Sequence, residues 1–294
     1  MKTNAIIRII LFSIAILVLL GILLAGLAFG LYVSDGRLAG FTISTSSENL
    51  PVTSDGTVNQ GLVLAPLVHN LDIEWVSGTI TIQPDESTED ITITEYGVSD
   101  TKYQMDYKQS GDTLKIQYCK ESITFPSFGI NVDVSKDLLI TVPADWVCES
   151  LDIDAAAANI EVNDLTIREV DFDGASGTCD FANCQVDQMD LDGASGDITF
   201  TGTLNELDFD GASASCYLEV TNVPDRIDID GMSGDLDLTL PADCGFTVSI
   251  DAMSSDFTSD FPTTVTNGKH VYGNGKCRIN FSGMSGDLTI RKGQ

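Results

Sequence analysis

Apolar and polar residues alternate in a short unit that recurs along the second half of the chain. The clearest copy, Met189 to Phe200, reads MDLDGASGDITF. Apolar and acidic residues alternate over its first four positions, small residues follow, and a second alternation closes the unit. A period of two predicts strands with one buried face, and the small residues suit a sharp bend. Each unit is therefore predicted to be a strand, a bend and a strand.

Seven copies of this unit follow one another, and an eighth stands alone upstream. The tandem copies begin at Leu151, Val170, Met189, Leu207, Ile227, Val248 and Ile279, and the isolated copy begins at Leu71. By subtraction, the tandem starts lie 19, 19, 18, 20, 21 and 31 residues apart. A short period is typical of solenoids, whose units bury their apolar faces by stacking. We therefore predict an all-β fold: a parallel, β-helix-like solenoid of repeats of about 19 residues.

Stacking in register would align like positions of the repeat in columns. The third and tenth positions are apolar in every tandem copy, which supports the alignment. The second and fourth positions instead place aspartates in two outward columns, here called the acidic columns. The second-position column is Asp152, Asp171, Asp190, Asp208 and Asp228; the fourth-position column is Asp154, Asp173, Asp192, Asp210, Asp230 and Asp251. Like charges on neighbouring strands repel, so these columns require an explanation.

Calcium is the metal that the acidic columns could hold, because hard cations prefer oxygen ligands. The candidate ligands are Asp171, Asp173, Asp190, Asp192, Asp208, Asp210, Asp228 and Asp230. The later ligands of an EF-hand and the glycine-rich RTX pattern are both absent. The alternative is a solvated acidic face that confers solubility. No other cofactor is expected.

The repeat does not predict an enzyme. Its recurring serine lacks a GxSxG elbow, and the only two histidines, His69 and His270, are not part of the repeat. Acid–base catalysis needs two carboxyl groups with separated pKa values, whereas the repeats resemble one another. We therefore expect no catalytic residue.

The charge balance restricts the partners. The chain has 44 acidic and 15 basic residues, for a net charge of −29, which argues against nucleic acid because binding it requires neutralising phosphates. The expected partners are an extracellular protein or a cationic surface polymer.

The amino-terminal part predicts a membrane anchor. Residues 9–34 carry no charge and are long enough to cross a hydrocarbon core, which takes about 20 residues. Lys2 and Arg8 precede this span and place a short tail, residues 1–8, in the cytoplasm. We expect a single-pass protein of the cell membrane with an extracellular bulk, although small residues such as Gly26 and Ala28 leave signal-peptide cleavage as an alternative. Residues 35–61 are predicted to form a stalk, residues 62–150 an amino-terminal all-β part, and residues 151–294 the solenoid with its carboxy-terminal cap.

Seven cysteines are unusual in a region predicted to be extracellular. Cys179 and Cys216 occupy the inward tenth position two repeats apart, about 9–10 Å by strand spacing, which exceeds the roughly 7 Å limit for a disulfide. We predict that both are buried thiols. Cys244 and Cys277 could approach each other near the last repeat. No CxxC motif occurs, so a zinc or redox site is not expected.

Several motifs together resemble a known family. They are the SGD-type repeats, the preceding PAD turns at Pro143–Asp145 and Pro241–Asp243, and a Gly273-Asn-Gly275 approach to a final SGDLTIR. This pattern, over roughly residues 62–292, is similar to the "putative adhesin" domain of unknown function found in bacterial cell-envelope proteins. The resemblance implies an all-β, solenoid-like fold and a non-enzymatic surface interaction. An accessory or sensory protein in envelope-stress signalling is the first alternative, and a polysaccharide-binding or polysaccharide-cleaving β-helix is the second.

Overall fold

Strands account for nearly all regular structure in the computed structural model, which describes residues 58–63, 65–98, 103–119, 135–213 and 215–293. Within these ranges there is one short 3-10 helix, η1 (Ala65–Leu67), and no helix long and apolar enough to cross a membrane. The predicted tail (1–8) and transmembrane helix (9–34) lie outside the described residues. So does the predicted stalk (35–61), except for residues 58–61, which belong to strand β1 (Val58–Val63).

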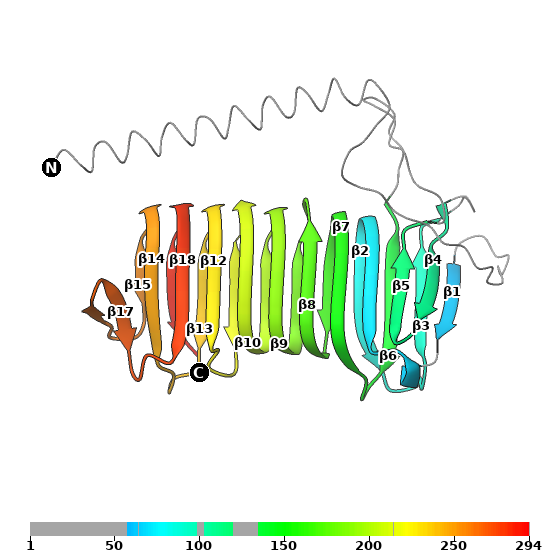
Figure 1. Ribbon diagram of the computed structural model, residues 1–294, viewed down its shortest axis with the longest axis horizontal. Coiled ribbons are helices and arrows are strands. Elements are labelled where there is room, and N and C mark those ends of the chain that lie inside the picture. Colours follow the sequence, from blue (N-terminus) through cyan, green and yellow to red (C-terminus); the bar gives the residue numbers. More distant parts are fainter. Residues whose placement is uncertain (1–57, 64, 99–102, 120–134, 214, 294) are drawn as a thin grey trace, which may run out of the picture. The chain divides into compact units, whose positions relative to one another are not determined.

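Each repeat forms one coil with two limbs, and like limbs of successive coils pair side by side in parallel (Figure 1). The first limb holds repeat positions 1–7 and the second limb begins at position 10. First limbs pair in the order β5 (Thr113–Gln117), β2 (Asn70–Asp85), β7 (Val147–Asn163), β8 (Thr166–Gly174), β9 (Cys179–Ser195), β10 (Ile198–Ser213), β12 (Arg226–Ser233), β18 (Cys277–Ser285) and β14 (Phe246–Ser254). Second limbs pair in the order β6 (Asp137–Pro143), β2, β7, β9, β10, β11 (Cys216–Val220), β13 (Leu236–Leu240), β19 (Leu288–Lys292) and β15 (Phe257–Ser259). The predicted all-β fold with mostly parallel strands is confirmed.

The core lies between the two limbs, where the apolar columns face each other. First-position residues such as Leu71, Leu151 and Ile227 are almost fully buried, and so are tenth-position residues such as Ile160 and Leu236. Because each coil contributes the same apolar positions, its neighbours extend the same core. Burial of this kind is the main favourable term in folding.

The isolated copy at Leu71 is not isolated in space. It forms β2, whose residues Leu71 and Ile80 pair with Leu151 and Ile160 of the first tandem coil. The segment between these two copies folds into an amino-terminal cap. There β5 and β6 add one more parallel coil, while β3 (Ile91–Tyr96) pairs antiparallel with both β6 and β1, and β4 (Asp106–Ser110) pairs antiparallel with β5. Antiparallel strands at the end of a stack protect its open edge.

The last two copies exchange places in the stack. The coil that begins at Ile279 lies between the coils that begin at Ile227 and Val248, so red β18 runs between yellow β12 and orange β14 in Figure 1. The Val248 coil is therefore the terminal one. Residues 260–276 cap it with β16 (Thr264–Thr266) and β17 (Lys269–Tyr272), and Phe261 and Tyr272 of this cap contact Phe246 with ring centroids 5.5 and 5.6 Å away. In sequence, the capping segment (residues 260–276) comes before the Ile279 coil, which then lies between the Ile227 and Val248 coils.

The bend of each repeat explains the recurring SGD sequence. Gly196 has φ of 142°, and a Cβ there would lie 1.7 Å from the carbonyl oxygen of Gly177 on the preceding coil. The following aspartate caps the next coil: Asp235 accepts a hydrogen bond from the backbone N–H of Asp287 at 2.8 Å, and Asp287 accepts one from that of Asp256 at 3.0 Å. The glycine and the aspartate of the motif therefore serve the stacking of coils.

The cysteines pack as apolar residues. Cys179 and Cys216 are buried thiols in the tenth-position column, as predicted. Cys148, Cys184, Cys244 and Cys277 are also buried without a disulfide, and Cys119 is buried as well. Burial raises the pKa of the Cys179 and Cys216 thiols to about 12, which keeps them protonated and unreactive.

Candidate functional site

The acidic columns form as the repeat predicts. In the second-position column, Asp152, Asp171, Asp190, Asp208 and Asp228 pair in direct succession. In the fourth-position column, Asp154, Asp173, Asp192, Asp210 and Asp230 do the same. Asp72 and Glu74 of β2 extend the two columns by one coil. Asp251 is separated from Asp230 by Ser282, because the last two coils exchange places.

Two cations lie at opposite ends of this carboxylate surface. At the amino-terminal end, Lys115 of β5 contacts Asp72 at 3.1 Å and Glu74 at 2.5 Å. Burial lowers the pKa of Lys115, but its hydrogen bonds to these two carboxylates outweigh burial and raise it.

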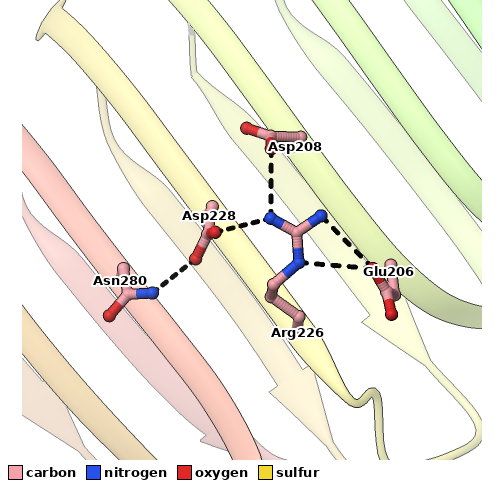
Figure 2. A network of polar contacts seen from close by, with 5 residues as sticks. All are labelled: Glu206, Asp208, Arg226, Asp228 and Asn280. Carbon is pink, nitrogen blue, oxygen red and sulfur yellow. Dashed lines mark hydrogen bonds and ion pairs between the residues drawn. The ribbon is translucent and has the colours of Figure 1, made fainter.

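At the other end, Arg226 of β12 binds three carboxylates, as Figure 2 shows. Its guanidinium contacts Asp228 at 2.7 Å, Asp208 at 3.1 Å and Glu206 at 3.2 Å. Hydrogen bonds to Asp228 and then to Asp208 and Glu206 outweigh burial and raise the pKa of Arg226. Asn280 donates to Asp228 at 2.6 Å from the next coil, which continues the column with an uncharged side chain.

Between Lys115 and Arg226, no ion pair within the described ranges neutralises the columns. Desolvation, followed by the neighbouring carboxylates Asp72, Asp154 and Asp171, raises the pKa of Asp152 to about 6. The pKa values of further column members are raised by desolvation first and by neighbouring aspartates second; these are Asp154, Asp171, Asp190, Asp192 and Asp210. Desolvation and, after it, the crowding of like charges therefore disfavour ionisation of these six aspartates.

The geometry gives the calcium candidates different surroundings. Asp208 and Asp228 already bind Arg226. Within the described ranges, no ion pair involves the other six candidates, which are Asp171, Asp173, Asp190, Asp192, Asp210 and Asp230. In the part of the chain that the structure describes, no group of three or more His, Cys, Asp or Glu side chains is arranged to hold a metal ion. The columns present carboxylates in rows rather than as a convergent cage.

Two open grooves flank the columns. One, of about 660 Å³, contains Glu169 and Glu206, which directly precede the first position of their repeats, together with Arg168, Asp187 and Asp225. The other, of about 470 Å³, follows the bends and is lined by the recurring serines Ser213, Ser233, Ser254 and Ser285 with Asp197, Asp235 and Asp287. Neither histidine lines these grooves. The backbone N–H of His69 donates to the backbone carbonyl oxygen of Asp112, and the His270 ring packs on Phe257 with centroids 4.4 Å apart. The first groove widens the acidic surface beyond the two columns.

Sequence reasoning did not identify the two terminal cations. Lys115 lies outside the repeats, in the cap that provides an additional coil. Arg226 immediately precedes its repeat, at the position that Glu206 occupies one coil earlier. Extending the repeat by one position toward the amino terminus would have revealed this arginine beside a carboxylate.

Residues 68–223, more than half of the chain, match the family model described as Toastrack DUF4097. No match is found among the curated proteins. Three solved structures are similar. A "putative adhesin" from Bacteroides fragilis has 11% identity and a TM-score of 0.44, with 81% of this chain and 98% of that chain covered. A "putative adhesin" from Parabacteroides distasonis has 14% identity and a TM-score of 0.40, with coverage of 81% and 98%. A "putative cell adhesion protein" from Clostridium sporogenes has 11% identity and a TM-score of 0.40, with coverage of 80% and 99%.

The matched region is long enough to assign the chain to this family, because it includes the amino-terminal cap, the Leu71 coil and the first tandem coils. The chain belongs to the Toastrack DUF4097 family.

Proposed function

We propose that this chain is a non-enzymatic protein of the bacterial cell surface, held by a single membrane span near its amino terminus. Its extracellular stack of coils binds a polycation, either a cationic surface polymer or a basic segment of another protein. The main support for this proposal is the pair of acidic columns, whose carboxylates stay in register over successive coils. Between Lys115 and Arg226, no ion pair in the described ranges neutralises them. Stacking like charges at the spacing of strands, about 4.8 Å, is destabilising. An external cation would relieve this repulsion.

The periodicity of the columns favours a polymer over a small ligand. Each coil adds two carboxylates at the same lateral positions, so the surface repeats its charges along the stack. A partner with regularly spaced ammonium or guanidinium groups could contact many coils at once. Individual exposed ion pairs contribute little, about 0–1 kcal/mol, and affinity would therefore come from their number.

The test is calorimetric titration of poly-lysine into the full chain in detergent micelles. Asp190→Asn with Asp192→Asn removes two charges from the columns. The matched control is Glu161→Gln with Asp180→Asn. It removes two exposed charges that pair with each other on neighbouring second limbs. We expect the column variant to weaken binding about tenfold and the control to change it less than twofold. If both variants lose the same affinity for poly-lysine, net charge alone attracts the polymer, and the acidic columns are not a specific binding surface.

Calcium bridging is a narrower version of the proposal, and it is tested in the same samples. Calcium chloride is compared with magnesium chloride at equal ionic strength. If micromolar calcium alone raises the melting temperature, and the Asp190→Asn with Asp192→Asn variant abolishes that rise, the columns hold calcium. If both salts act alike, the columns are a polycation surface without a metal site.

The anchor and its orientation are tested separately. We expect the chain to fractionate with membranes, and external protease on intact cells to digest the region after residue 35. Protection of that region in intact cells would contradict the proposed location.

A further inference from the structure

The three exposed methionines of the described chain form one row. Met232, Met284 and Met253 occupy the sixth position of three coils and are 43%, 41% and 54% exposed. By contrast, the other two methionines in the described residues, Met105 and Met189, are 5% and 2% exposed and belong to the core. In the described residues, exposed methionines therefore occur only at the sixth repeat position of the last three coils.

The exchange of the last two coils is what brings these residues together. On either side of Met232 and Met284, Gly231 pairs with Gly283 and Ser233 with Ser285. Likewise, Ala252 pairs with Gly283 and Ser254 with Ser285, on either side of Met253 and Met284. Met284 is therefore the middle member of the row, although it is the last of the three in sequence.

The same position holds alanine in the preceding coils, at Ala156, Ala175 and Ala212. A small residue therefore satisfies the bend, and the methionines are not needed to build it. The surroundings also change at this point, because the second-position column continues as Asn280 and the fourth-position column as Ser282. The acidic surface gives way to a row of thioethers.

We propose that Met232, Met284 and Met253 form a binding site for a soft monovalent metal ion, Cu(I). Thioethers are soft ligands that select Cu(I) over calcium, magnesium or manganese. On the scale of a zinc–thiolate bond of about 2.3 Å, two sulfurs that share an ion lie up to about 4.6 Å apart. Adjacent strands are spaced by about 4.8 Å, so neighbouring thioethers can share an ion, and the flexible methionine side chain lets the outer two lean toward Met284.

The nearest fourth-position aspartates are Asp230 and Asp251, which pair with Ser282 from either side. Each precedes an outer methionine by two residues on the same strand. Their charge would attract a cation to the row without supplying the preferred ligands. The ligands of this site are distinct from those of the polycation surface, since they are thioethers on the Arg226 coil and on the two coils beyond it.

Silver(I) nitrate is the probe, because Ag(I) has the same soft character and does not change its oxidation state. The full chain is labelled with ¹³C at its methionine methyl groups and titrated in chloride-free detergent buffer. We expect the signals of Met232, Met284 and Met253 to shift together and to saturate at one equivalent, while those of Met105 and Met189 stay in place. If metal binds while the three exposed methyl signals do not shift, the proposal is wrong.

Leucine variants separate coordination from apolar contact, because leucine keeps the apolar surface and removes the sulfur. We expect Met284→Leu to weaken Ag(I) binding at least tenfold, and the matched core variant Met189→Leu to leave it unchanged. Cys277→Ser tests the buried thiols as competing ligands and should also leave the affinity unchanged. Tight binding by Met284→Leu, or its loss in Cys277→Ser, would overturn the proposal. Circular dichroism of each variant verifies that the coils remain folded.

Discussion

Single side chains decide how closely neighbouring coils can approach. Gly196 combines φ of 142° with a Cβ position 1.7 Å from the carbonyl oxygen of Gly177. Gly196→Ala should therefore lower the free energy of unfolding by about 2 kcal/mol or more, from backbone strain and the forced separation of two coils. Chemical denaturation would measure this loss.

The matched control lies three residues earlier. A Cβ on Gly193 would meet its nearest neighbour, the carbonyl oxygen of Gly174, at 3.9 Å, which is an ordinary contact. We expect Gly193→Ala to change stability by less than about 1 kcal/mol in either direction. Equal destabilisation by both variants would show that the coils do not pack as described.

The raised pKa of Asp152 links stability to pH. Its pKa is about 6 in the folded chain, above the ordinary value of 3.8, because of desolvation and the neighbouring carboxylates. The folded state therefore binds more protons than the unfolded state between about pH 4 and 6, and stability falls as pH rises through this window. We expect a higher melting temperature at pH 5 than at pH 7.

Asp152→Asn should raise the melting temperature at pH 7 and flatten its dependence on pH. Glu161→Gln, which removes an exposed charge from the second limbs, serves as the control for net charge. A melting temperature that rises from pH 5 to pH 7 in the unmodified chain would contradict the assignment.

Among the larger elements, the amino-terminal cap depends on a buried ion pair. The ammonium of Lys136 contacts Glu95, and both side chains are almost completely buried. Lys136 also donates to the carbonyl oxygen of Tyr103 at 2.7 Å and lies over the rings of Trp75 and Tyr118. Desolvation lowers the pKa of Lys136, and Glu95 opposes this shift.

Glu95→Gln would leave the Lys136 ammonium buried without its counter-charge. Removal of one partner from a buried pair costs about 3–5 kcal/mol, so we expect the cap to unfold at lower denaturant concentration. Glu89→Gln, an exposed change near the same strand, should cost less than about 0.5 kcal/mol. Fluorescence of Trp75 would report on the cap, and unchanged stability of Glu95→Gln would show that the pair is dispensable.

The order of the last coils can be tested with engineered cysteines. Asp228 and Asn280 face each other on adjacent strands, at a spacing of about 4.8 Å that allows a disulfide. Asp228→Cys with Asn280→Cys should therefore cross-link under mild oxidation and change the mobility of the denatured chain. Asp228→Cys with Ser249→Cys, two strands apart, should not. If only the second pair formed a cross-link, the coils would be stacked in the order in which the repeats occur in the sequence.

For the molecule as a whole, the repeat predicted which residues share a column but not which coils are neighbours. A shared position fixes the register, so the pairing of Asp190 with Asp208 followed from the alignment. Which coils lie next to each other in the stack depends on how the segments that connect them pack. Residues 260–276 pack on Phe246 of the terminal coil through aromatic contacts, and these contacts have no periodic signature in the sequence. For the same reason the sequence did not show that the Leu71 copy joins the stack.

The charge of the described chain is distributed along the stack in two parts. Carboxylates dominate the first limbs from Asp72 to Asp230. Arginine replaces glutamate before the first repeat position at Arg226, and asparagine and serine replace the column aspartates in the Ile279 coil. Arg226 lies at the boundary and satisfies the last carboxylates of the acidic part. The sequence predicted the acidic part, whereas this boundary depends on the exchanged coils.

The exchanged coils also restrict how such a protein can lengthen by gene duplication. An extra repeat inserted among the coils between Leu151 and Ile227 would find a parallel neighbour on each side, and the rest of the stack would simply shift by one place. A repeat appended after residue 292 would meet no open place, because the Ile279 coil already has neighbours on both sides. Growth of the family should therefore occur in the interior of the repeat array, where an added coil gains a parallel neighbour on each side.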